Sequence, residues 1–224
     1  MARPSKRRIA EALLERHGRT LAEELGIDVA AGTPSPLFRL LVASILFSAR
    51  IGHGIAFAAA RALAEQGWTT PQKLAQSTWR QRVQVLNRAG YARYDESTSR
   101  MLGDTCALLL ERYRGDLRRL RDEAERDPRR ERTLLKEFKG LGDVGVDIFF
   151  REVQLAWDEL YPFADRRALQ AAQQLDLGDE PHALARLVDR DARAFAPLVA
   201  ALVRVELERD YDGVREQAAH SGGR

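Results

Sequence analysis

The stretch LLKEFKGLGDVGVDIFF, residues 134–150, places three glycines inside a segment whose other residues favour helices. Residues 130–138 and 144–155 each follow the helical period of apolar residues. The KGLGD between them has room only for a tight turn. Gly140 can end the first helix in a left-handed conformation, and the other two glycines lie at the start of the second helix. The stretch therefore predicts two helices that fold back on each other.

The turn between these helices has the chemistry of an anion-binding site. The first N–H groups of a helix have no partner within the helix, and the helix dipole adds partial positive charge there. Glycines leave such donors uncovered, which suits a phosphate oxygen. The alternative interpretation is that the three glycines only make a tight helix–helix turn. The residues of the turn leave both interpretations open.

Almost every other segment also follows the helical period, and no run of alternating polarity is long enough to predict a strand. We therefore predict an all-α protein of about ten helices with short connections. Besides the two hairpin helices, one or two are expected over residues 4–17 and 19–25, one starts at residue 71, and the others are expected at residues 37–51, 55–66, 77–88, 94–113, 116–127, 165–175 and 181–210.

Composition bounds the class of protein. The chain has 224 residues, of which 45% are apolar and 31% charged, as in soluble globular proteins. Its apolar runs are shorter than the roughly 20 residues that span a bilayer, and its first residues lack the apolar stretch of a secretory signal. We therefore expect a cytoplasmic protein, associated with the nucleoid if it is bacterial, and no membrane partner.

The cysteine content and the net charge indicate which metals and macromolecules the protein could bind. A single cysteine, Cys106, cannot form an internal disulfide or by itself hold a zinc ion or an iron–sulfur cluster. We therefore expect no metal site. The net charge of +3 permits nucleic acid binding, although an ordinary solvated surface has a similar charge.

The segment FKGLGDVGVDIFF resembles the hairpin of the helix-hairpin-helix DNA glycosylases, the endonuclease III-like superfamily. That pattern has an apolar residue, then Gly, apolar, Gly, two variable residues and a small residue, and residues 138–145 occupy those places in order. The family's aspartate, which follows the second hairpin helix, matches Asp165 in YPFADRRALQAAQQLDL. Weaker likeness at residues 33–63 and 86–117 extends the resemblance over about residues 33–178.

The resemblance implies a DNA glycosylase-like architecture of two helical subdomains with a cleft between them. It implies N-terminal helices over 1–32 that pack with the C-terminal subdomain, a helical bundle over 33–140, the hairpin over 134–150, and a C-terminal subdomain over 141–212. The polar composition of the last residues predicts a disordered tail over 213–224. The resemblance also implies double-stranded DNA as partner, a monomer, and a monovalent cation at the hairpin when DNA is bound. The implied DNA-binding residues are Lys136, Lys139, Gly140, Leu141, Gly142, Val144, Gly145 and Arg50.

The same resemblance makes Asp165 the catalytic residue. A carboxylate stabilises the oxocarbenium-like sugar that forms as a base leaves, and it can activate the attacking water. The alternative is that Asp165 only caps the helix that follows it. Val144 stands where lyase members carry a nucleophilic lysine, and the C-terminal region lacks the cysteines of the cluster-bearing members. The resemblance thus implies a monofunctional glycosylase without an iron–sulfur cluster.

Several further positions are candidates for contact with an extruded base. Arg50 stands where the family has a glutamine that probes the gap left by the base, but it could equally be a surface cation. Tyr91, Tyr94 and His53 could line a base pocket by stacking, and the alternative for the tyrosines is a place in the core. Two hypotheses follow: a monofunctional DNA glycosylase, or a helix-hairpin-helix DNA-binding protein that has lost the chemistry.

Overall fold

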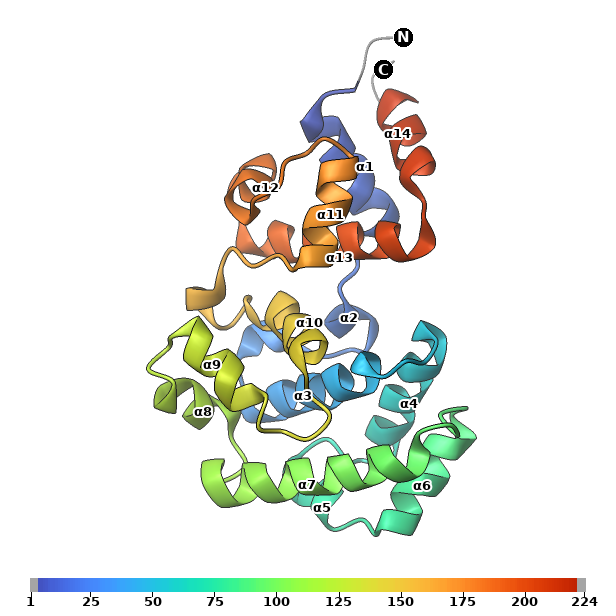
Figure 1. Ribbon diagram of the computed structural model, residues 1–224, viewed down its shortest axis with the longest axis vertical. Coiled ribbons are helices and arrows are strands. Elements are labelled where there is room, and N and C mark those ends of the chain that lie inside the picture. Colours follow the sequence, from blue (N-terminus) through green and yellow to red (C-terminus); the bar gives the residue numbers. More distant parts are fainter. Residues whose placement is uncertain (1–3, 221–224) are drawn as a thin grey trace. The chain divides into compact units, whose positions relative to one another are not determined.

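The computed structural model describes residues 4–220, and all of its regular structure is helical (Figure 1). Within these residues it has fourteen α-helices, two 3₁₀ helices and no strand, which confirms the predicted all-α class. The α-helices are α1 (Lys6–His17), α2 (Leu21–Glu24), α3 (Pro34–Ser48), α4 (His53–Glu65), α5 (Pro71–Ala75), α6 (Trp79–Arg88), α7 (Asp95–Tyr113), α8 (Leu117–Glu123), α9 (Pro128–Leu135), α10 (Asp143–Val153), α11 (Arg166–Gln174), α12 (Pro181–Leu187), α13 (Ala192–Glu208) and α14 (Tyr211–His220). The 3₁₀ helices are η1 (Val29–Ala31) and η2 (Asp158–Leu160). None of the described helices is long and apolar enough to cross a membrane.

The chain divides into two compact units. Unit 1 contains the described parts of Met1–Glu24 and Leu160–Arg224, and unit 2 is Leu25–Glu159. The divisions therefore fall after residues 24 and 159, whereas the sequence placed them after residues 32 and 140. The later boundary differs because α10 packs against α3 and η1 of unit 2. Phe149 of α10 also meets Trp157 edge-on, with ring centroids 5.5 Å apart.

Helix α3 forms the centre of unit 2. Nine of its fifteen residues are buried, including the consecutive run from Leu40 to Leu46, so the helix is covered around its whole circumference. Helices α4, α8 and α10 pack directly against it, and α5, α6 and α7 form a further group of packed helices. Buried Arg82 ties α6 to α7, because its Nε donates to the Ser99 carbonyl oxygen at 3.0 Å. Unit 2 thus holds the end of α3 and the start of α10 within one core.

Unit 1 is built around α13. Helices α1, α11 and α12 pack against α13, and α14 packs against α1. The buried face of α13 carries the apolar residues Phe195, Leu198, Val199, Leu202 and Val205. The core of this unit therefore joins the first and last parts of the chain.

Two sequence-based boundaries in unit 1 are wrong. The expected helix over residues 181–210 is two helices, because Asp189 and Arg190 take left-handed conformations and Asp191 caps α13. The expected disordered tail over 213–224 is helical as far as His220. Val214 and Ala218 of α14 are buried, and this spacing of apolar residues was hidden among polar neighbours. Residues 221–224 lie outside the described part of the chain.

Candidate nucleic-acid interface

The hairpin turn depends on Gly140 for two reasons. Its φ of 86° lies in the left-handed region that favours glycine. A Cβ at this position would also lie 2.7 Å from Met101 Sδ and 3.3 Å from Ile45 Cγ2. Leu141, the next residue, is buried. The turn is therefore packed into unit 2 and cannot take a side chain at Gly140 without movement.

The start of α10 is open in contrast. Gly142 is its N-cap at φ −83° and has no side chain to accept the first N–H groups. A Cβ at Gly142 would meet nothing within 4 Å. Asp143 is exposed and Val144 is 57% exposed. Residues 142–144 at the start of α10 thus face open space, as an anion site requires.

Gly145 has a packing role. A Cβ there would lie 2.7 Å from Leu141 Cδ1 and 3.4 Å from Ser48 Cβ. The missing side chain lets α10 approach the end of α3. Ser48 fixes the same contact, because its Oγ donates to the Gly140 carbonyl oxygen at 3.0 Å. Sequence reasoning missed Ser48 and Met101, since both meet the hairpin through long-range contacts.

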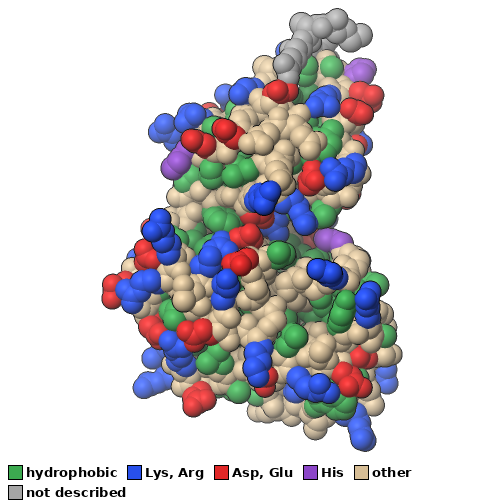
Figure 2. Space-filling model, in the orientation of Figure 1, with side chains coloured by type: hydrophobic (Ala, Val, Ile, Leu, Met, Phe, Trp, Pro, Cys, Tyr) green, Lys and Arg blue, Asp and Glu red, His purple; other side chains and the backbone are tan. Residues whose placement is uncertain are grey.

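Both candidate lysines are paired with carboxylates. Lys136 Nζ lies 2.9 Å from Asp143 Oδ1, and Lys139 Nζ lies 2.9 Å from Asp104 Oδ2. The hydrogen bond from Lys136 lowers the pKa of Asp143. Basic and acidic side chains are also interspersed on the face of unit 2 seen in Figure 2, without one continuous basic patch. A phosphate would therefore compete with acids already present at the hairpin.

Arg50 and His53 follow directly from the end of α3. Arg50 is exposed, and within residues 4–220 its side chain makes no hydrogen bond or ion pair. His53 is also exposed and begins α4. Its ring meets Phe47 edge-on at 5.0 Å and lies parallel to Phe57 at 6.4 Å between centroids. The loop after α3 therefore offers an unpaired cation and an accessible aromatic ring.

The two tyrosines lie in different environments. Tyr91 is 0% exposed, and its hydroxyl donates to the Leu46 carbonyl oxygen at 2.9 Å. Burial raises the pKa of Tyr91. Tyr91 therefore lies in the core, as the alternative interpretation has it, and its ring is not accessible in this structure. Tyr94 is half-buried, with the Arg93 guanidinium 5.3 Å from its ring centroid.

Asp165 belongs to unit 1, whereas the other candidate residues belong to unit 2. It is the N-cap of α11, and its Oδ1 accepts a hydrogen bond from the Ala168 N–H at 2.9 Å. Its exposed fraction is 8%, while Arg166 and Arg167 beside it are exposed. The capping role suggested by the sequence is therefore present. The cap fixes the orientation of the carboxylate.

The described residues contain no group of three or more His, Cys, Asp or Glu side chains placed to hold a metal ion. Cys106 is buried in α7, and burial raises its pKa to about 12. Its sulfur is therefore a protonated thiol at neutral pH.

Comparison with known proteins gives one structural likeness. No protein-family model matches the chain, and no curated protein matches it. Among solved structures, it is similar to a trapped endonuclease III–DNA covalent intermediate in an estranged-adenine complex. The likeness has 18% sequence identity and a TM-score of 0.48, and it covers 75% of this chain and 73% of that chain. The functional argument is therefore carried by the residues of this chain.

Proposed function

We propose that this protein binds double-stranded DNA through the α9–α10 turn and is a monofunctional DNA glycosylase. The observation that carries the proposal is the structure of the turn: Gly140 is left-handed, and Gly142 begins α10 next to two exposed residues, Asp143 and Val144. The first N–H groups of α10 and the helix dipole suit a backbone phosphate oxygen. The occupant of this site is then a DNA strand.

Cations around the turn add to this binding. Arg50 has no acidic partner among residues 4–220, so it can pair with a phosphate at no cost in broken ion pairs. Lys136 and Lys139 must first leave Asp143 and Asp104. We expect modest affinity with a marked salt dependence, because each phosphate contact releases counterions.

Asp165 is proposed to carry the chemistry. Its carboxylate is oriented by the Ala168 N–H, and a carboxylate has two oxygens with several acceptor positions. It stabilises positive charge on the sugar as the base leaves with the bonding electrons, and it takes a proton from the water that attacks C1′. Val144 cannot form a Schiff base, so no strand cleavage accompanies base release.

The test is base release from a panel of duplexes that each contain one damaged or mismatched base. Asp165→Asn should abolish release and leave duplex binding unchanged, because Asn caps a helix about as well as Asp. An Asn variant with full activity would overturn the catalytic assignment. Binding without release from any duplex would instead support the non-catalytic DNA-binding protein.

A second arm tests the binding surface. Gly142→Leu adds a side chain in open space, so it should weaken duplex binding about tenfold while the fold persists. Gln84→Leu, on the exposed surface of α6, is the matched control and should bind as the parent does. Equal affinity in the two variants would exclude the turn as the DNA contact.

A further inference from the structure

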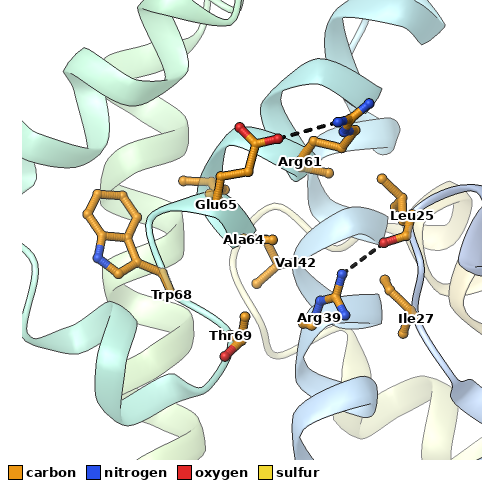
Figure 3. Close-up of a pocket in the computed structure, with 11 residues that line it drawn as sticks. Leu25, Ile27, Arg39, Val42, Arg61, Ala64, Glu65, Trp68 and Thr69 are labelled. Atoms are coloured by element: carbon orange, nitrogen blue, oxygen red, sulfur yellow. Dashed lines mark hydrogen bonds and ion pairs between the residues drawn. The ribbon is translucent and has the colours of Figure 1, made fainter.

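Unit 2 has a surface pocket between α3, α4 and the segment before η1 (Figure 3). Its volume is about 380 Å³, near the lower end for small-molecule sites. Apolar side chains make up much of its lining: Leu25, Ile27, Val42, Ala60, Leu63 and Ala64. Ala60 and Ala64 lie one turn apart on α4 and present only methyl groups. The pocket can therefore hold a compact apolar group.

Two arginines contribute charge to the pocket, and only one of them is neutralised. Arg61 pairs with Glu65 at 3.4 Å, and both side chains are well exposed at the rim. Arg39 instead donates to the carbonyl oxygens of Gly26 and Leu25, at 2.9 and 2.8 Å. Within residues 4–220 Arg39 has no carboxylate partner, and burial lowers its pKa. The pocket therefore keeps one uncompensated positive charge.

The hydrogen bonds of Arg39 leave part of its guanidinium unused. A guanidinium has five N–H donors, and two bonds to carbonyls are made here. Arg82 gives a useful contrast. It is buried, whereas Arg39 is half-buried, and within residues 4–220 it too has no acidic partner, but it donates to both the carbonyl and the hydroxyl oxygens of Ser77 and Ser99. Arg82 is thus explained as a structural tie, whereas Arg39 keeps both charge and donors at a pocket wall.

We propose that this pocket binds a small organic monocarboxylate with an apolar body. The carboxylate pairs with Arg39, whose planar fork matches two carboxylate oxygens. The hydrocarbon part lies against the methyl groups of Ala60 and Ala64. The site uses no residue of the α9–α10 turn and not Asp165, so it stands whether or not the protein acts on DNA.

The probe for the test is sodium octanoate, titrated into the full-length protein by calorimetry. Binding should be saturable at one site per chain, and neither octan-1-ol nor inorganic phosphate should match it, because each lacks half of the required chemistry. Trp68 lines the pocket, so its fluorescence should follow the same titration. Trp68→Phe should remove that signal without removing the heat of binding.

Two variants address the two halves of the site. Arg39→Met should weaken octanoate binding at least tenfold, while Arg80→Met, at an exposed arginine of α6, should leave it unchanged. Because Arg39 also holds two backbone carbonyls, Ala64→Leu provides a variant that keeps Arg39 and fills the pocket, and it too should weaken binding at least tenfold. The absence of saturable octanoate binding, or parental affinity in both pocket variants, would overturn the proposal.

Discussion

Helices α10 and α11 begin in opposite ways. Helix α10 is preceded by Gly142, which has no side chain to accept a hydrogen bond, and its first two residues are exposed. Helix α11 is preceded by Asp165, which accepts the Ala168 N–H and is almost buried. At both helix starts the first N–H groups have no partner within the helix, and the helix dipole places partial positive charge there. The difference teaches that a helix start can either receive an anion from outside or hold in place a carboxylate that the chain already has.

Helix α9, which precedes the hairpin turn, carries an unusual buried acid. Glu131 is 0% exposed, and neither of its carboxyl oxygens has a hydrogen-bond partner within the described residues. Burial, together with the neighbouring Glu159, raises the pKa of Glu131 from 4.5 to about 9. Arg121 binds Glu159 through Nε at 2.6 Å and also pairs with Asp158. Glu131 is therefore protonated in the folded protein at neutral pH.

The largest expected effect follows from this protonation. Between pH 4.5 and about 9 the folded state holds a proton that the unfolded state has lost, so stability should fall as pH rises, by up to about 1.4 kcal/mol for each pH unit. Glu131→Gln should remove this slope and stabilise the protein at pH 8. Urea unfolding at several pH values measures the slope of the free energy of unfolding against pH. Exposed Glu111→Gln should leave the slope unchanged, and an unchanged slope in Glu131→Gln would contradict the assignment.

The next effect separates the two glycines of the turn. Gly140→Ala should lower the free energy of unfolding by about 2 kcal/mol, because an L residue is strained at its left-handed φ and the new Cβ approaches Met101. Gly142→Ala should cost less than about 1 kcal/mol, since only capping preference changes there. Chemical denaturation of both variants gives the comparison. Similar losses would mean that the start of α10 is not open.

The cap of α11 should have a smaller effect. Asp165→Ala removes the acceptor of the Ala168 N–H and should cost about 1 kcal/mol of stability. Asp165→Asn keeps an acceptor and should stay within about 0.5 kcal/mol of the parent. Thermal unfolding distinguishes them. A large loss in the Asn variant would show that the negative charge of Asp165, and not its capping bond, holds this region.

The smallest effect concerns charge at the open helix start. Asp143→Asn removes a carboxylate from the first turn of α10 and releases Lys136 from its ion pair. Duplex DNA affinity at low salt should rise about two- to fivefold, in keeping with roughly 0.3–1 kcal/mol for one charge at a helix terminus. Fluorescence anisotropy of a labelled duplex measures the change in affinity. Asp122→Asn, which also removes one acid from unit 2, controls for net charge. An equal gain in DNA affinity in that variant would show that the effect does not come from the start of α10.

The hairpin could be predicted from the sequence because its signals are local. The glycine spacing and the apolar period place the turn within a few residues, and the Asp before RRALQAAQQ predicts the cap of α11. The packing partners of the turn could not be found this way. Ser48 and Met101 reach the hairpin across long stretches of chain, and no local pattern reports such contacts.

Tertiary contacts also decide two features that the local sequence could not settle. The sequence left two places open for Tyr91, a base pocket and the core. In the structure its ring lies in the core of unit 2 and its hydroxyl donates to the Leu46 carbonyl oxygen. The sequence did not predict helix α14, because a polar segment taken by itself indicates disorder. In the structure its few apolar residues are buried, and the helix packs against α1. In both cases a tertiary contact decides the outcome, because the local preference is weak. The role of Asp165 in chemistry stays a prediction.

Unit 1 is made of two separate stretches of the chain, and this affects the order in which the two units can fold during synthesis. Helix α1 leaves the ribosome before unit 2, but α13, against which it packs, leaves the ribosome after unit 2. Unit 2 is continuous and lies wholly between them, so it can fold as soon as residue 159 has emerged. The apolar face of α1 has no native cover until α13 has also emerged. A nascent chain stalled after residue 159 should therefore contain a folded centre and an unpartnered leading helix.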